Sequence, residues 1–371
     1  MTIFVYLLKL NLKLVYFFLK LLPINKSKIV FISRQSNNIS IDFKMIAEKL
    51  VEKKYKVVII SKKIDTGIIN YLKYYFNLYK QMYHLATSKV CVIDSYCIPV
   101  CILNHKKSLV VIQIWHAMGA IKQFGYQTLS KEAGRNEKIS HIMCMHKNYD
   151  YVLSGSQSMI EPFSKAFNVP CNKIIVNGLP RIDYIINNKK ILSKKIKMDY
   201  KLLKLKKNVL YVPTFRKNES VKINELINNF DFDKFNLIIK LHPSSNVKIN
   251  NKKVFTCPNY SSLQLLTIAD YVITDYSAIS IEAASLDIPI FLYLYDYDQY
   301  VAKNGLNIDL FNEFDKYASK DINSILKSLK QEKYDMNIIY NFKDKYLDHD
   351  YRNYTDKLVK FINDKIGDSN E

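Results

Sequence analysis

The chain has 371 residues, of which 49% are hydrophobic and 24% charged, and its formal net charge is +21. This length exceeds one ordinary hydrophobic core and suits two domains of about 150–180 residues each, and the composition excludes a largely disordered protein. The positive charge predicts anionic partners, namely nucleic acid, an acidic membrane surface or phosphorylated substrates, although lysines spread along a whole chain are equally typical of a solvated surface.

The N-terminal segment is apolar but interrupted by Lys9, Lys13 and Lys20. No uninterrupted stretch is long enough to span a bilayer, and the uncharged core and cleavage site of a signal peptide are missing. On a helix the three lysines share one side and apolar residues cover most of the rest. This pattern predicts that residues 1–26 form a helix in a membrane interface, with the lysines towards anionic headgroups. The alternative is an ordinary helix docked on the first domain, which Asn11 on the apolar side favours.

Short apolar runs then alternate with amphipathic segments, a pattern typical of parallel strands covered by helices on both faces. In the first half of the chain the expected strands are 28–33, 55–61, 89–94, 109–115, 149–155 and 173–178.

The fourth of these runs opens the stretch VIQIWHAMGAIKQFGYQ, residues 111–127, where a strand leads directly into a turn. Ligands of open parallel sheets bind beyond the carboxyl ends of strands. His116 stands at such an end, and a neutral imidazole there is a candidate base for an attacking hydroxyl. Lys122, in the same turn, is expected to meet an anionic acceptor.

Arg181 follows the last strand of this half, after a turn at 178–180, and suits bidentate recognition of a phosphate. The Lys/Leu-rich stretch 189–207 contains no expected strand and predicts a domain boundary. The strands expected beyond it are 208–214, 236–242, 253–257, 271–275 and 289–293.

Two strand ends of the second half carry phosphate-suited side chains. Thr214 ends the strand 208–214 and offers a hydroxyl for a phosphate contact, and Arg216 follows it as a cation in addition to Arg181. His242 stands before Pro243, which ends the strand 236–242, and its imidazole is suited to donate to a phosphate oxygen. A lone histidine in that position is more often structural.

The third strand end lies within the segment 271–289. Thr274 and Asp275 end the strand, and Ser277 is expected to open a helix whose free N–H groups favour a phosphate. Glu282 follows one and a half turns later, in place to accept a hydrogen bond from a ribose hydroxyl. The alternative is plain helix capping by Asp275 or Ser277, with Glu282 solvated.

Neither a G-x-G-x-x-G fingerprint nor a P-loop is present. The six cysteines include no Cys-x-x-Cys pair and lie mostly in apolar runs, which indicates buried side chains in a reducing compartment. The pattern as a whole predicts two Rossmann-like domains, 27–188 and 203–335, with a cleft between them and a helical tail over 336–371.

Taken in order, these segments resemble the CDP-glycerol glycerophosphotransferase family of teichoic-acid synthesis. The resemblance runs from about residue 28 to residue 335. It rests on the Trp-His turn with Lys122 and Gly125, and on the elements 178–183, 213–216, 240–243, 274–282 and 295–300. The sequence Ala-Met-Gly after His116, where many members have Gly-Thr-Pro, looks closest to the short priming-type members.

The resemblance implies an α/β protein of the GT-B type, with two Rossmann-like domains whose parallel sheets face a central cleft. It implies attack of an acceptor hydroxyl on the β-phosphorus of CDP-glycerol, with release of CMP. The acceptor would be a lipid-linked saccharide or a polyol phosphate, and the enzyme would lie peripherally on the cytoplasmic face of the cell membrane. No cofactor, metal or nucleic-acid partner is implied.

The resemblance also implies residue roles. His116 would be the base, and Glu282 would bind the ribose. The residues implied to hold and neutralise the diphosphate are His242, Arg181, Thr214, Thr274 and Ser277.

Three alternatives stay open. In the first, the donor is CDP-ribitol or another CDP-polyol. In the second, the protein is a GT-B glycosyltransferase that uses a sugar nucleotide. In the third, it is a non-enzymatic, basic membrane- or nucleic-acid-binding protein.

Overall fold

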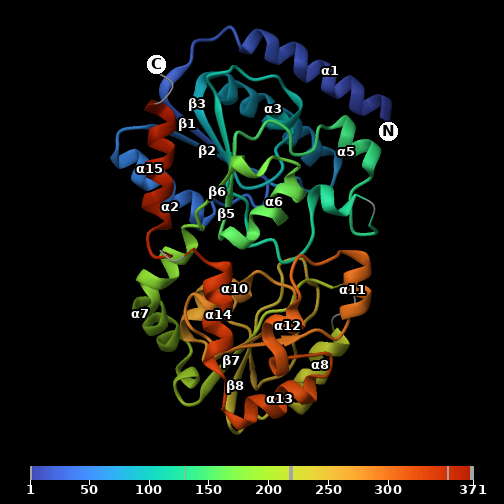
Figure 1. Ribbon diagram of the computed structural model, residues 1–371, viewed down its shortest axis with the longest axis vertical. Helices are drawn as coiled ribbons and strands as arrows, with labels where there is room; N and C mark the ends of the chain where they lie inside the picture. Colours follow the sequence, from blue (N-terminus) through green and yellow to red (C-terminus); the bar gives the residue numbers. More distant parts are fainter. Residues whose placement is uncertain (1, 130, 217–219, 349–350, 368–371) are drawn as a thin grey trace. The chain divides into compact units, whose positions relative to one another are not determined.

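The computed structural model describes residues 2–129, 131–216, 220–348 and 351–367. Contacts divide the chain into two compact units (Figure 1). The first unit comprises Met1–Met118, Phe124–Arg181 and Asn353–Glu371. The second unit comprises Gly119–Gln123 and Ile182–Arg352. The chain therefore passes between units at four points, whereas the sequence pattern placed a single boundary between 188 and 203.

The first unit is built on a six-stranded sheet in the order β2-β1-β3-β4-β5-β6, in which every neighbouring pair is parallel. Its strands are β1 (Asn25–Ser33), β2 (Lys56–Ser61), β3 (Ser88–Ile93), β4 (Val110–Gln113), β5 (Tyr151–Ser154) and β6 (Ile174–Val176). Its helices are α1 (Thr2–Leu19), α2 (Ile41–Glu52), α3 (Ile68–Thr87), α4 (Ile98–Ile102), α5 (Glu137–Ile142), α6 (Ile160–Phe167) and α15 (Tyr354–Gly367). Every residue of β3 is buried, as expected for a central strand covered on both faces.

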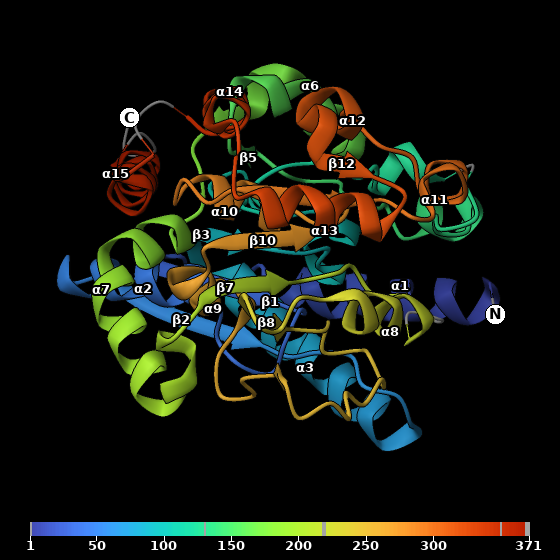
Figure 2. The same ribbon diagram turned by 90° about the horizontal axis from the view of Figure 1, so that it is seen from below.

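The second unit has its own six-stranded parallel sheet, in the order β12-β11-β10-β7-β8-β9. Figure 2 shows β10, β7 and β8 side by side. Its strands are β7 (Lys207–Tyr211), β8 (Phe235–Ile239), β9 (Val254–Phe255), β10 (Tyr271–Thr274), β11 (Ile290–Tyr293) and β12 (Ala318–Ser319). Its helices are α7 (Arg181–Asp199), α8 (Ser220–Asn229), α9 (Ser262–Leu265), α10 (Ile279–Ala284), α11 (Tyr297–Lys303), α12 (Leu310–Phe314), α13 (Ile322–Gln331) and α14 (Met336–Tyr346). The predicted α/β class with parallel sheets is confirmed.

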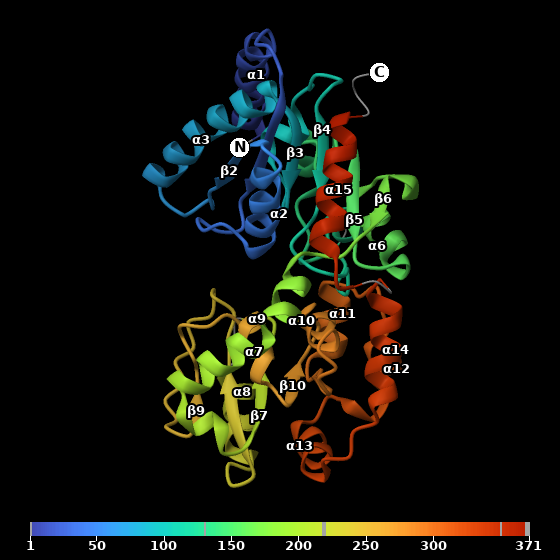
Figure 3. The same ribbon diagram turned by 90° about the vertical axis from the view of Figure 1, so that its left-hand side faces the viewer.

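The C-terminal helix α15 belongs to the first unit, where it lies against α2 and the sheet (Figure 3). The Asn177 side chain donates to the carbonyl oxygen of Tyr354 at 3.3 Å. A Cβ atom on Gly178 would lie 2.2 Å from the Tyr354 ring, so only glycine admits this contact. The turn at 178–180 thus serves to seat the end of the chain.

The side chain of Arg181 is held inside the first unit by Asp42 of α2. The backbone N–H and Nε of Arg181 donate to the two Asp42 carboxylate oxygens at 2.8 and 2.9 Å. The two side chains are only 19% and 2% exposed. This buried pair ties the start of α7 to the start of α2.

No helix in the described part of the chain is long and apolar enough to cross a membrane.

We predict that Asp42→Ala destabilises the protein by about 3–5 kcal/mol, because it leaves the Arg181 guanidinium buried without its counter-charge. Urea unfolding followed by circular dichroism measures this as a lower transition midpoint. Glu161→Ala is the control, since Glu161 pairs with Lys165 at 2.6 Å on the exposed surface of α6 and its loss should leave the midpoint unchanged. Equal midpoints for the two variants would contradict the assigned role of Asp42.

Candidate functional site

The first candidate cluster lies at the carboxyl end of β4, where the backbone reverses at Trp115. The strand ends at Gln113, two residues before the expected end. Trp115 has a φ of 59°, a left-handed conformation that is a genuine outlier for a bulky residue. The fully buried Gln113 side chain stabilises it by accepting from the Trp115 N–H at 2.9 Å and donating to the Ser95 carbonyl at 3.3 Å. Strained backbone of this kind recurs at functional sites.

The left-handed turn sends the Trp115 ring into an aromatic cluster. The ring stacks on Phe124 at a centroid distance of 4.6 Å and meets the edge of Phe167 at 5.2 Å. The next residue, His116, is half-buried at the ends of β3 and β1. Its Nδ1 lies 3.1 Å from the Asp94 carbonyl oxygen and 3.0 Å from Nε2 of Gln35.

These two contacts decide which nitrogen of neutral His116 carries the proton. A backbone carbonyl only accepts, so its contact with Nδ1 requires an Nδ1–H. The side-chain amide of Gln35 can present either its oxygen or its nitrogen, since the two are exchanged by a half-turn. We therefore assign the proton to Nδ1, which leaves the Nε2 lone pair of His116 as the basic site.

Asp94 and Gln35 were not among the residues singled out from the sequence. Asp94 ends the expected strand 89–94 and Gln35 lies two residues after the expected strand 28–33, so the strand-end criterion applies to them as it does to His116. Burial raises the pKa of the Asp94 carboxyl to about 6, and hydrogen bonds from Ser33 and Ser95 oppose that shift. The carbonyl of Asp94, which no side-chain pattern reveals, is the atom that contacts His116.

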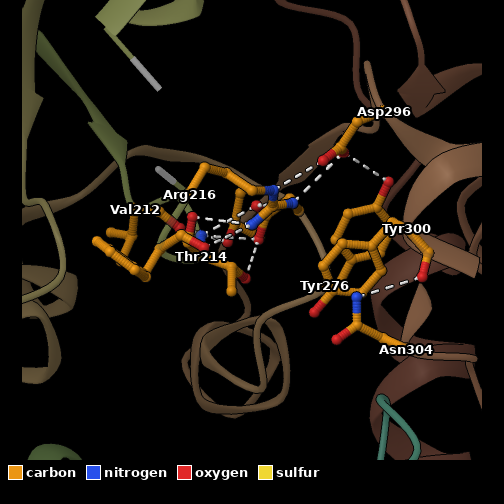
Figure 4. Close-up of polar contacts among 10 residues, drawn as sticks. Val212, Thr214, Arg216, Tyr276, Asp296, Tyr300 and Asn304 are labelled. Carbon is orange, nitrogen blue, oxygen red and sulfur yellow. Dashed lines mark hydrogen bonds and ion pairs between the residues drawn. The ribbon is translucent and has the colours of Figure 1, made fainter. Parts of the chain in front are cut away.

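The second cluster lies in the second unit and is organised around Asp275, directly after β10 (Figure 4). The Asp275 carboxylate accepts from the Thr214 backbone N–H at 3.0 and 2.9 Å and from its hydroxyl at 2.5 Å. An Arg216 guanidinium nitrogen lies 3.1 Å from the same carboxylate. Three residues predicted separately from two strand ends are therefore in direct contact.

Arg216 is held from its other side by Asp296, which lies in the element 295–300 and was not among the predicted site residues. Its Nε donates to Asp296 at 2.7 Å, and Tyr276 donates to the same carboxylate at 3.1 Å. Tyr276 and Tyr300 stack at a centroid distance of 3.8 Å, with the Arg216 guanidinium 4.7 Å from the Tyr300 ring (Figure 4). Ion pairs and aromatic faces together fix the orientation of this cation.

Lys122 also belongs to the second unit, because the segment Gly119–Gln123 is bonded into it. Lys122 forms an antiparallel bridge with Leu306, and Gln123 donates its N–H to the Gly305 carbonyl at 3.1 Å. Burial lowers the pKa of the Lys122 ammonium; the nearby charge of Asp275 opposes this shift, and that of Arg216 adds to it. Lys122 therefore lies in the electrostatic field of the Asp275 cluster.

His242 is exposed, and its Nδ1 is 3.1 Å from the backbone N–H of Ser244. A backbone N–H only donates, so Nδ1 is the acceptor and the neutral ring carries its proton on Nε2. This tautomer is the opposite of the one assigned to His116. It gives His242 a ring N–H with which to donate a hydrogen bond.

The remaining predicted residues differ in how they are placed. Thr274 is fully buried and donates its hydroxyl to the Val212 carbonyl at 2.6 Å. The Ser277 hydroxyl lies 3.4 Å from the N–H of Ile279, the first residue of α10. Glu282 is only 4% exposed, so the alternative of a solvated glutamate is wrong.

Arg181, predicted to hold the diphosphate, pairs with Asp42 in the first unit. Among the described residues, no group of three or more histidine, cysteine, aspartate or glutamate side chains is arranged to hold a metal ion.

Comparison with known proteins places this architecture in a family. The family model described as CDP-Glycerol:Poly(glycerophosphate) glycerophosphotransferase matches residues 14–364. The teichoic acid ribitol-phosphate primase of Bacillus spizizenii (strain ATCC 23059 / NRRL B-14472 / W23) is 28% identical over 365 residues, which cover 92% of each chain. The teichoic acid glycerol-phosphate primase of Bacillus subtilis (strain 168) is 30% identical over 301 residues, which cover 78% of this chain and 77% of the primase.

The fold is similar to that of the wall teichoic acid polymerase TagF, with a TM-score of 0.74 and 20% identity over 93% of this chain and 90% of that chain. A UDP-GlcNAc 2-epimerase from Methanocaldococcus jannaschii gives a TM-score of 0.60 at 15% identity, covering 91% of this chain and 99% of that chain. These likenesses confirm the predicted GT-B fold. With a family model that matches nearly the whole chain, they show that the protein belongs to the CDP-glycerol:poly(glycerophosphate) glycerophosphotransferase family.

Proposed function

We propose that the protein transfers glycerol phosphate from CDP-glycerol to a hydroxyl of a lipid-linked or polymer acceptor, with release of CMP, in the synthesis of teichoic acid or a related cell-surface polymer. The observation that carries this proposal is the contact of His116 Nδ1 with the Asp94 carbonyl at 3.1 Å, which leaves Nε2 as a base. Family membership supports the reaction class.

The relatives include both primases and polymerases. The matched region covers 92% of the ribitol-phosphate primase but only 56% of the poly(ribitol-phosphate) polymerase from the same organism. The glycerol-phosphate primase at 30% identity favours CDP-glycerol as donor, and the ribitol-phosphate primase at 28% keeps CDP-ribitol as the second candidate.

In the proposed reaction the acceptor oxygen attacks the β-phosphorus of the donor. A bond forms between that oxygen and phosphorus, and the bond from phosphorus to the bridging oxygen breaks, so that CMP leaves with the electron pair. His116 Nε2 takes the proton of the acceptor hydroxyl, which raises the nucleophilicity of the oxygen as it attacks. Negative charge grows on the phosphoryl oxygens and on the leaving CMP, where fixed donors and cations contribute most.

We assign these donors and cations to the second unit. His242 donates through its Nε2–H, and Lys122 and Arg216 supply positive charge. Asp275 holds Thr214 in place through hydrogen bonds and is a counter-charge of Arg216. Asp275 and Thr214 thereby organise the donor site, and Ser277 and Glu282 stay candidates for the phosphate and the ribose.

We also propose that the protein acts as a peripheral protein at the cytoplasmic face of the cell membrane, through α1. The helix docks through Leu12 and Tyr16, which are 0% and 2% exposed. Its opposite side is apolar and faces outwards, and the exposed side chains there are Tyr6, Leu7, Leu10, Leu14, Phe17 and Phe18. An apolar stripe facing outwards on a strongly basic protein is typical of a helix that enters an anionic membrane interface.

Two details of α1 differ from expectation. Lys9 does not face outwards as Lys13 does, since the Lys9 ammonium donates to the Ile142 carbonyl at 2.6 Å. Asn11 accepts from the Tyr79 and Tyr75 hydroxyls of α3 at 2.7 and 3.1 Å, so it joins two neighbouring helices (Figure 3). Asn11 therefore helps to dock α1 on the first unit, as the alternative of a docked helix expects.

His116→Ala is expected to lower the rate of CMP release about 10²–10⁴-fold, the usual contribution of a positioned base. The affinity for CDP-glycerol, measured by calorimetry, should stay within a few-fold of the wild type. His141→Ala is the matched control, because His141 is an exposed histidine of the same unit. Near-normal turnover of the His116 variant would remove the base assignment.

Lys122→Met should weaken the binding of CDP-glycerol about ten- to a hundredfold, the usual range for losing one charge-assisted contact to a phosphate. The KM for the acceptor should not change. Lys327→Met, on the exposed face of α13, removes the same charge elsewhere in the second unit and should have no effect. A raised acceptor KM with unchanged donor affinity would instead support the acceptor role expected from the sequence.

Replacing Leu10, Leu14 and Phe17 together by Gln is expected to reduce binding to anionic vesicles by on the order of tenfold or more, because three large apolar side chains no longer enter the bilayer. These side chains are exposed, so the fold should be retained. Flotation with anionic and zwitterionic vesicles measures the effect. Unchanged flotation of the triple variant would refute membrane docking through α1.

A further inference from the structure

Two arginines of the first unit share one aromatic side chain near His116. Arg34 follows β1, and its backbone N–H donates to the Ser95 hydroxyl at 3.2 Å. Arg135 lies in the turn before α5. The two guanidinium carbons lie 5.2 and 5.1 Å from the centroid of the Tyr96 ring. Tyr96 is itself fixed, since it is 5% exposed and donates its hydroxyl to the Met143 carbonyl at 2.9 Å.

In the part of the chain that the structure describes, neither arginine has a carboxylate within ion-pair distance. Burial and the charge of Arg34 lower the pKa of the Arg135 guanidinium. Burial and both arginines also lower the pKa of His146 to about 3, so this neighbour stays neutral. Two like charges held in electrostatic range without a carboxylate favour a bound anion.

The location of the pair narrows the class of anion. Arg34 is followed directly by Gln35, which contacts His116, and Ser95 follows Asp94, whose carbonyl contacts the same imidazole. Arg34 therefore lies at the strand ends that hold the proposed base, and the shared contact with Tyr96 places Arg135 close to it. A guanidinium matches the geometry of phosphate oxygens, and an aromatic ring beneath it fixes its plane.

We propose that Arg34 and Arg135 bind a phosphate or diphosphate group of the acceptor whose hydroxyl His116 deprotonates. The inference rests on the proposed transfer function and extends it, because it names the feature of the acceptor that the first unit recognises. Acceptors that carry such a group should react with a high kcat/KM, and acceptors that lack it with a low one.

The test compares two acceptors that share one disaccharide. In one the disaccharide is joined to a lipid through a diphosphate, and in the other it is joined directly to an alkyl chain. The wild type should use the diphosphate acceptor about ten- to a hundredfold more efficiently in kcat/KM, the range of a lost charge-assisted hydrogen bond or two. Arg34→Gln combined with Arg135→Gln should bring that ratio close to one and leave the affinity for CDP-glycerol unchanged.

Lys138→Gln is the control, because Lys138 is an exposed cation on α5, three residues from Arg135, and should keep the wild-type ratio. The inference is overturned if the double variant retains the preference, or if it loses activity equally with both acceptors. It is also overturned if the variant keeps the preference and loses binding to anionic vesicles, which would assign the arginines to a lipid headgroup.

Failure of the proposed function gives a different result. In that case the wild type releases CMP from neither CDP-glycerol nor CDP-ribitol with either acceptor. Calorimetric binding of the two acceptors to the wild type and the double variant then still tests the arginine pair. Equal affinity of the wild type for both acceptors would overturn it.

Discussion

The left-handed backbone of Trp115 is the constraint on which the first unit's candidate site depends. An L-residue with a large side chain is unfavourable there, at a cost of order 1–3 kcal/mol. The buried Gln113 amide and the stacking of the indole on Phe124 offset that cost. Because the indole turns into the core, the next side chain is delivered to the strand ends. The strained turn at Trp115 therefore determines where the His116 side chain lies.

The backbone group that contacts Nδ1 also explains how His116 and His242 can have different roles. A carbonyl oxygen at Nδ1 of His116 favours a ring that accepts at Nε2, whereas a backbone N–H at Nδ1 of His242 favours a ring that donates there. In the second unit, Asp275 has the corresponding organising role, since it orients Thr214 and Arg216 through short contacts.

Much of the fold, and the family, can be predicted from the sequence. The alternation of apolar runs predicts both parallel sheets, and the ordered motifs predict the family. The sequence does not show which partners a side chain finds across the fold. Arg181 was expected at a phosphate, but Asp42, 139 residues away in sequence, holds it. Lys122 was expected with His116, but its segment pairs with Leu306 of the second unit. Arg34 and Arg135 form a pair only because Tyr96 lies beside both.

The most direct test of the central claim is the tautomeric state of His116, measured by long-range proton–nitrogen correlation NMR on protein labelled with ¹⁵N-histidine. The His116→Ala variant assigns the signals. In the neutral ring the account predicts a protonated Nδ1 and an unprotonated Nε2, with the opposite pattern for His242. A His116 ring protonated on Nε2 would contradict the account, because the nitrogen proposed to take the acceptor's proton would already carry one.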